Sequence, residues 1–258
     1  MILKRDFHYT PKGKNRPLHI YLPDNYYETD ERYPVMYFFD GHNLYRDEDA
    51  TYGKSWGLKN FLDNWEKPMI IVGMQCGFEG NERLSEYLPY KATDDYFGAI
   101  NGIGDQTFQW IIDEVKPVID REYRTYPFRE CTAIAGASMG GLMAVYGAVH
   151  HNRWFSKAAC VSSAMGFCMD ALMADMEANK MDPDTRMYLS WGTQEAHGIR
   201  DVNSDDDHSY TYHCNKAVAD KATEYGATAK LRCQVGGGHN EVYWEQLVPE
   251  FMHFLWME

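Results

Sequence analysis

Short runs of apolar residues alternate along this chain with longer stretches in which apolar residues recur at helical spacing. A strand buried on both faces is apolar throughout, whereas a helix lying on a sheet is apolar along one stripe only, so the alternation is typical of an α/β protein with a mostly parallel sheet. The pattern predicts strands at 18–22, 35–40, 69–74, 132–137, 158–162, 187–191 and 230–235. It predicts helices on both faces of that sheet, at 55–65, 105–121, 140–149, 168–179, 213–225 and 241–256.

Several local features refine this outline. The strand at 18–22 alternates between apolar and polar residues, which favours an antiparallel strand at the sheet edge. Ser55 is expected to cap the first helix, and Pro117 is expected to kink the second. Two stretches, about 77–104 and 198–209, are expected to be long irregular loops, which often have a functional role. The chain of 258 residues contains no linker, so we expect a single domain.

The charge and the terminal sequence exclude several classes of partner. The chain has 25 Lys and Arg against 38 Asp and Glu, a formal charge of −13. Such a surface repels phosphate backbones and anionic lipid headgroups, so we expect neither a nucleic acid nor a membrane as a partner. The sequence contains no apolar stretch long enough to span a membrane, and its start lacks the features of a signal peptide, which predicts a cytoplasmic protein. Oligomeric state stays open.

The cysteines indicate free thiols. None of the six forms a C-x-x-C pair, and most lie in apolar runs, which argues against a disulfide framework or a zinc site. Patterns such as H-E-x-x-H or a P-loop are also missing from the sequence, so we expect no metal and no cofactor.

The most informative motif is the sequence Gly136-Ala-Ser138-Met139-Gly140 between a predicted strand and a predicted helix. The G-x-S-x-G pattern in this setting is typical of a nucleophile elbow, a sharp turn that exposes a serine hydroxyl above the sheet. We therefore expect Ser138 to be a nucleophile. The N–H of Met139, at the start of the helix, is expected to stabilise an oxyanion.

A serine nucleophile needs a general base and an orienting carboxylate, which follow it in the chain order Ser, acid, His in α/β hydrolases. His239 is the best candidate for the base, because it follows the last predicted strand on a run of three glycines. Glu195 is the best candidate for the acid, just after the penultimate strand. The alternatives are Asp201 and the acidic run Asp205–Asp207, which is more typical of a solvated loop.

The second oxyanion donor is expected in the turn after an early buried strand. The sequence Asp40-Gly41-His42-Asn43 occupies that place. Gly41 is expected to let the backbone approach the substrate, and the N–H of either His42 or Asn43 would point to the oxyanion.

Four blocks of sequence carry a resemblance to a known family. They are Tyr33–Tyr45, Glu82–Pro89, Tyr123–Pro127 and Gly136–Leu142. In this order they resemble the putative esterase family of α/β hydrolases, which includes esterase D, feruloyl esterases, siderophore esterases and mycolyltransferase-like proteins. The resemblance runs from about residue 16 to the C-terminus. It implies an α/β-hydrolase fold and a Ser–acid–His esterase, with Ser138 and His239 as nucleophile and base.

The resemblance also suggests a substrate. Arg83 matches a family motif near the edge of the active site, where it would contact substrate or form a structural ion pair, and Tyr87 and Trp244 are aromatic residues near the predicted catalytic loops. We expect hydrolysis of short acyl or feruloyl esters of carbohydrates through an acyl-enzyme. The alternatives are a siderophore trilactone esterase, a thioesterase such as an S-formylglutathione hydrolase, and an inactive hydrolase fold that serves as a binding module.

Overall fold

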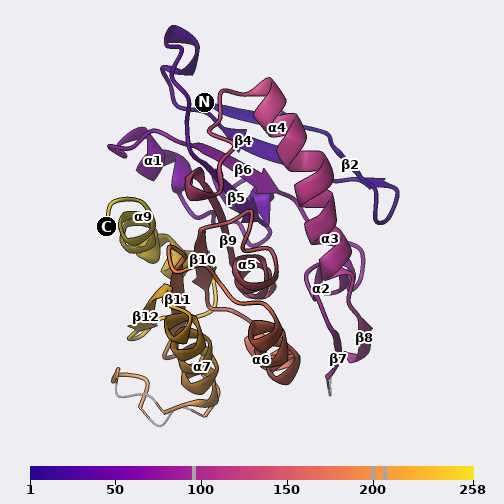
Figure 1. Cartoon of the computed structure of the whole chain (residues 1–258), viewed down its shortest axis with the longest axis vertical. Coiled ribbons are helices and arrows are strands. Elements are labelled where there is room, and N and C mark those ends of the chain that lie inside the picture. Colours follow the sequence, from indigo (N-terminus) through magenta and orange to yellow (C-terminus); the bar gives the residue numbers. More distant parts are fainter. Residues whose placement is uncertain (95–96, 199–200, 206–207) are drawn as a thin grey trace.

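The computed structural model describes residues 1–258 except 95–96, 199–200 and 206–207 (Figure 1). A central sheet of eight strands has the order β1-β4-β6-β5-β9-β10-β11-β12. The strands are β1 (Ile2–Arg5), β4 (Leu18–Tyr21), β5 (Val35–Phe39), β6 (Ile70–Met74), β9 (Thr132–Ala137), β10 (Lys157–Val161), β11 (Arg186–Gly192) and β12 (Thr228–Gln234). The six strands from β6 to β12 in this order run parallel, and β4 runs antiparallel to both of its neighbours, β1 and β6. The predicted α/β fold is confirmed.

The predicted edge strand is placed differently. It forms β4, which is antiparallel as expected, but β1 pairs with it on the outside and takes the edge position. All four residues of β4 are buried, including His19, whose ring bonds Gln75 at 3.0 Å. The polar residue His19 is therefore buried and not exposed as the alternation suggested, because the Gln75 side chain provides a hydrogen-bond partner for its ring.

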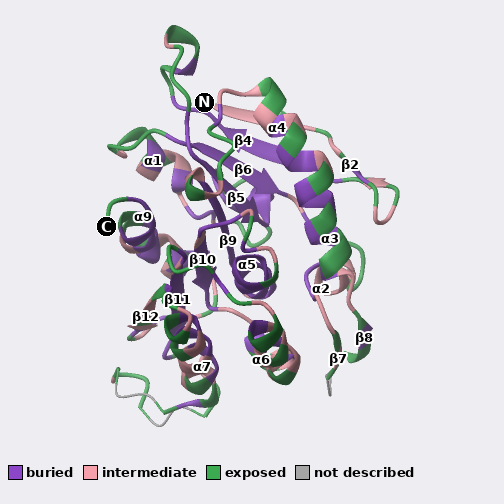
Figure 2. Ribbon diagram, in the orientation of Figure 1, coloured by how far each residue is buried: buried purple, intermediate pink, exposed green. Residues whose placement is uncertain are grey.

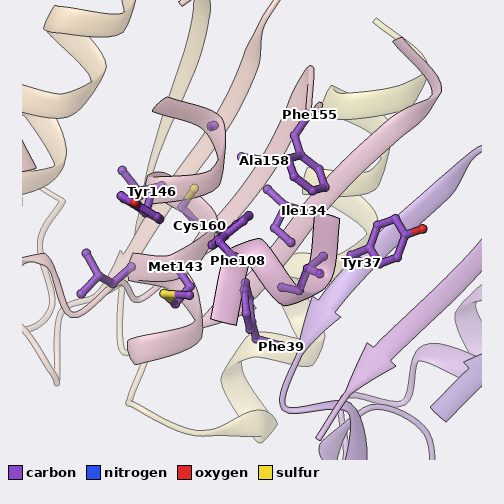
Figure 3. Packing of buried hydrophobic residues seen from close by; sticks show 14 of the residues in the cluster. Tyr37, Phe39, Phe108, Ile134, Met143, Tyr146, Phe155, Ala158 and Cys160 are labelled. Atoms are coloured by element: carbon purple, nitrogen blue, oxygen red, sulfur yellow. The ribbon is translucent and has the colours of Figure 1, made fainter. Parts of the chain in front are cut away.

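Helices cover both faces of the sheet, and each face has its own apolar core (Figure 2). One face carries α3 (Gly104–Trp110), α4 (Lys116–Glu122), α5 (Met139–His150), α6 (Met169–Ala178) and α7 (Tyr210–Glu224). The other carries α1 (Leu58–Asp63), α8 (Glu241–Trp244) and α9 (Val248–Trp256). Phe108 of α3 lies at the centre of the larger core, with ring centroids 5.9 Å from Phe39 and 5.8 Å from Phe155 (Figure 3).

The first two predicted helices differ in detail from the prediction. Helix α1 begins at Leu58 behind Gly57, because the Ser55 hydroxyl bonds the Asp47 carboxylate at 2.8 Å and does not cap the helix. The predicted second helix consists of α3, a π-helical turn at Ile111–Val115, and α4. The backbone stays helical through all three, and Pro117, which has no N–H to donate, closely follows the π-helical turn.

The long stretch at 77–104 is more regular than predicted. It contains α2 (Glu82–Glu86) and a hairpin of β7 (Lys91–Asp94) and β8 (Gly98–Asn101). These elements have only four or five residues each, too few to show an apolar periodicity. A second small hairpin is formed by β2 (His8–Tyr9) and β3 (Lys14–Asn15). Short 3-10 turns lie at Tyr26–Glu28, Gly41–Asn43, Arg129–Cys131, Met165–Phe167 and Glu245–Leu247.

All six cysteines are free thiols, as predicted. Within the described ranges, none of the helices combines the length and the apolar character needed to cross a bilayer.

Candidate active site

Ser138 lies in a sharp turn between β9 and α5, with φ 59° and ψ −122°. This positive φ is uncommon for a residue with a side chain and is the strained geometry of a nucleophile elbow. The turn is possible because Gly136 has no side chain: a Cβ there would lie 2.5 Å from the Gly140 backbone. The Ser138 N–H donates to the Val161 carbonyl at 3.0 Å, so β10 holds the turn in place.

His239 and Glu195 meet at the carboxyl ends of β11 and β12. The Nδ1 atom of His239 is hydrogen-bonded to Oε2 of Glu195. Backbone contacts fix the two loops to each other, because the Gln194 N–H donates to the Gly237 carbonyl and the Gly236 N–H donates to the Thr193 hydroxyl, both at 2.8 Å. The acid and the His that follow Ser138 in the chain therefore lie next to each other in the structure.

The two alternative acids that the structure describes, Asp201 and Asp205, do not occupy this place. Asp201 accepts a hydrogen bond from the Asn203 N–H within its own exposed loop. Asp205 is also exposed, and Asp206 and Asp207 lie outside the described residues.

Ser162, which the sequence analysis did not single out, holds the second oxygen of Glu195. Its hydroxyl donates to Glu195 Oε1 at 2.6 Å and accepts from the Trp244 indole N–H at 2.9 Å. The Gly192 N–H donates to the same carboxylate oxygen at 2.6 Å. Glu195 is 8% exposed at its side chain, whereas His239 is 45% exposed. The carboxylate is thus fixed in the protein, and the imidazole faces the cavity.

The turn after β5 begins with Asp40, which has a left-handed backbone with φ 57°. The Asn43 N–H donates to the Asp40 carbonyl at 2.9 Å and is occupied within the turn. His42 comes one residue before Asn43, whose N–H is the first to be hydrogen-bonded within the 3-10 turn. The His42 N–H therefore has no partner inside the turn. Of the two candidate donors, the geometry therefore favours His42. The Asn43 side chain donates to the buried carboxylate of Glu241 at 3.0 Å.

Arg83 and Tyr87 support this turn from behind. Arg83 forms two hydrogen bonds of 2.8 Å to the Asp40 carboxylate, and the Tyr87 hydroxyl accepts from the Asp40 N–H at 3.2 Å. Burial would raise the pKa of Asp40, yet the Arg83 guanidinium holds it below its ordinary value. Burial lowers the pKa of the His42 ring to about 4, which keeps it neutral near pH 7.

Of the four residues expected to contact substrate, Arg83 and Trp244 line a cavity beside Ser138, whereas Gly41 and Tyr87 do not. Tyr87 is 2% exposed, lies under the turn and lines neither of the two cavities beside Ser138. Gly41 faces the protein, because a Cβ there would lie 2.3 Å from the Gly73 backbone. Trp244 and Arg83 do line a cavity, though each is also bound to a neighbour, Ser162 and Asp40 respectively.

Two cavities meet at Ser138 and His239. The larger has a volume of about 680 Å³ and the smaller about 290 Å³. The larger lies beside the loops after β10 and β11, and the smaller lies beside the Asp40–Asn43 turn. The pair of residues is therefore open to a ligand from two sides.

Comparison with known proteins identifies the family of this chain. Residues 11–255 match the family described as "Putative esterase". The chain is 24% identical to the "Uncharacterized protein YbbA" of Bacillus subtilis (strain 168) over 187 residues, which are 71% of this chain and 70% of that protein.

A further relative is the "Endo-1,4-beta-xylanase/feruloyl esterase" of Xylanibacter ruminicola, 30% identical over 138 residues, which cover 50% of this chain but only 17% of that protein. Among solved structures, the enterobactin esterase FES from Shigella flexneri in the presence of enterobactin has a TM-score of 0.74 and 16% identity, covering 100% of this chain and 59% of the other. That likeness shows a shared fold. With the family match over nearly its whole length, the chain belongs to the putative esterase family and is an esterase.

Proposed function

We propose that this protein hydrolyses carboxylic esters through an acyl-enzyme on Ser138, with His239 as base and Glu195 as the orienting acid. The observation that carries the proposal is the His239–Glu195 hydrogen bond beside a strained serine, in cavities that Ser138 and His239 share. The N–H groups of Met139 and His42 are the proposed oxyanion donors.

The chemistry follows from these positions. His239 accepts the Ser138 proton as the oxygen attacks the ester carbonyl, and the developing oxyanion is stabilised by the two N–H groups. The imidazolium then gives the proton to the departing alcohol. Water attacks the acyl-enzyme in the same way, which releases the acid and restores Ser138. Glu195 holds the proton of Nδ1 and stabilises the imidazolium.

We propose short acyl or feruloyl esters of carbohydrates as the substrates. The larger cavity is within the size range of small-molecule sites and carries the aromatic side chains Phe167, Trp191 and Tyr210. Neither lysine nor arginine is among the described residues that line it, so it offers little to a multiply charged catecholate. The feruloyl esterase named among the relatives supports the same substrate class.

The test is a hydrolysis profile of the purified protein, using p-nitrophenyl acetate, butyrate and octanoate together with methyl ferulate. Ser138→Ala is the control, and turnover should fall by about 10³-fold or more. A catecholate trilactone and S-formylglutathione test the alternative substrates. Wild-type turnover that survives in Ser138→Ala would refute the nucleophile. A folded protein that is inactive on every substrate and unlabelled by a fluorophosphonate would point to an inactive binding module.

A further inference from the structure

The imidazole of His42 has a buried nitrogen without a partner. Nε2 is hydrogen-bonded to the Thr51 hydroxyl at 2.8 Å, while Nδ1 has no hydrogen-bond partner among the described residues. His42 is 5% exposed, and the edge of its ring packs against Phe78 with centroids 4.8 Å apart. Buried polar atoms are almost always paired, so an unpaired one indicates a water, an ion or a special role.

Two other donor groups lie beside this ring. A carboxylate oxygen of Asp40, a ring nitrogen of His42 and the Cys76 sulfur all lie within 4.8 Å of one another, and all three residues are buried. Asp40 and His42 belong to the turn after β5, and Cys76 follows the neighbouring strand β6. The pairing of the two strands brings together donors that are far apart in the sequence.

We propose that Asp40, His42 and Cys76 bind a thiophilic divalent cation such as Zn²⁺. One sulfur, one imidazole nitrogen and one carboxylate oxygen are a donor set that zinc uses, with water as the fourth ligand. All three residues line the smaller cavity, which provides an entry path and room for that water. The Cys76 thiol would give its proton to the solvent as the sulfur–zinc bond forms.

The surroundings suit such a site. If Nε2 carries the ring proton and donates it to Thr51, the lone pair of His42 is on Nδ1, the atom that has no other partner. Arg83 occupies both Asp40 oxygens, and the Cys76 thiol is hydrogen-bonded to the same carboxylate, so the cation would replace the thiol proton between the sulfur and a carboxylate oxygen.

Binding would have a consequence for catalysis. The His42 side chain would hold the cation while its backbone N–H is the proposed oxyanion donor, so we expect the cation to displace the turn and inhibit turnover. This consequence depends on the proposed esterase mechanism, whereas binding of the cation does not. The two are therefore measured separately.

Binding is tested with Co²⁺, which reports a thiolate ligand through a charge-transfer absorption band in the near ultraviolet. We expect one equivalent to give the band in the wild type, Zn²⁺ to remove it, and Cys76→Ser to lack it. Cys131→Ser is the matched control, because Cys131 is half-buried and outside the cluster, and it should retain the band. Thr51→Val should weaken Zn²⁺ binding by about 10- to 100-fold.

Several outcomes would overturn the proposal. A cobalt band that persists in Cys76→Ser would place the thiolate ligand at another cysteine, outside the proposed site. Wild-type protein that fails to bind one equivalent would mean that the cluster holds no cation and that water bonds Nδ1. Zn²⁺ inhibition is then compared with each variant's own metal-free rate. Equal inhibition of the wild type and Cys76→Ser would place the inhibitory cation elsewhere, for example at His239. A protein inactive on all esters but positive for the band would refute the mechanism and leave the site intact.

Discussion

The hydroxyl of Ser162 lies 2.6 Å from Oε1 of Glu195 and holds that carboxylate in line with His239. Ser162 has a positive φ of 45°, which aims its side chain at the loop after β11. Since the hydroxyl also accepts from the Trp244 indole, residues from three separate segments meet at one oxygen atom. Ser162 is therefore a positioning residue for the proposed triad.

Replacement of Ser162 should impair turnover without affecting the fold. A hydrogen bond to a charged group contributes about 1.5–3 kcal/mol, so Ser162→Ala is expected to lower kcat by about 10- to 100-fold with little change in KM. Trp244→Phe, which loses the donor but keeps a ring, should have a smaller effect of about 2- to 10-fold. Ser190→Ala is the matched control, because this buried hydroxyl on β11 has no partner among the described residues and lines neither cavity. Equal losses in Ser162→Ala and Ser190→Ala would contradict the positioning role.

Substitution of the acid should be more severe. Glu195→Gln retains the size of the side chain but removes the charge that stabilises the His239 imidazolium, and in comparable triads this change costs up to about 10⁴-fold in kcat. Initial rates on p-nitrophenyl acetate measure the loss. Asp201→Asn, in the exposed loop, should leave the rate nearly unchanged. A strong loss in Asp201→Asn but not in Glu195→Gln would reassign the acid.

The ion pair behind the oxyanion turn should contribute to both stability and activity. Arg83→Ala leaves the Asp40 carboxylate, 10% exposed at its side chain, without its cation. Breaking a buried pair costs about 3–5 kcal/mol, and because the Arg83 side chain is 36% exposed we expect a loss of about 2–3 kcal/mol. Urea unfolding measures the loss. Arg121→Ala, at an exposed pair on α4, serves as the control and should cost much less.

Acid should destabilise the fold partly through His151. Burial lowers the pKa of this ring from 6.5 to about 4, and the ring stacks on Phe108 with centroids 4.8 Å apart. The unfolded chain takes up a proton below pH 6.5, while the folded chain does so only near pH 4, so stability present above pH 6.5 is lost between these values. The shift of 6.5 − 4 = 2.5 pKa units corresponds to about 3 kcal/mol.

His151→Leu should remove this part of the pH dependence. Its free energy of unfolding, measured by urea at pH 7 and at pH 4.5, should fall less on acidification than that of the wild type. His253→Leu, at an exposed position on α9, is the control and should follow the wild type. Identical acid sensitivity of His151→Leu and the wild type would refute the assignment.

Local patterns in the sequence were sufficient for much of the fold and for the elbow. The strands follow from short continuous apolar runs and most helices from apolar periodicity, because a strand buried on both faces is apolar throughout, whereas burial of one side imposes a period of about 3.6 on a helix. The elbow at Ser138 is local as well, since Gly136 and Gly140 allow a turn that few other residues could form. The β7–β8 hairpin escaped prediction because each strand has only four residues and Ile100 is the one buried residue of β8.

Only the tertiary structure decided the contacts that connect distant segments. The Asn43–Glu241 hydrogen bond spans 198 residues, and the Ser162–Trp244 contact spans 82. The choice of His42 over Asn43 as oxyanion donor depended on which N–H the turn already uses. Tyr87 was expected at the substrate, yet it supports Asp40 from below. Periodicity records how deeply a residue is buried, whereas the partner of a buried polar group is set by strand order and loop packing, which no local pattern encodes.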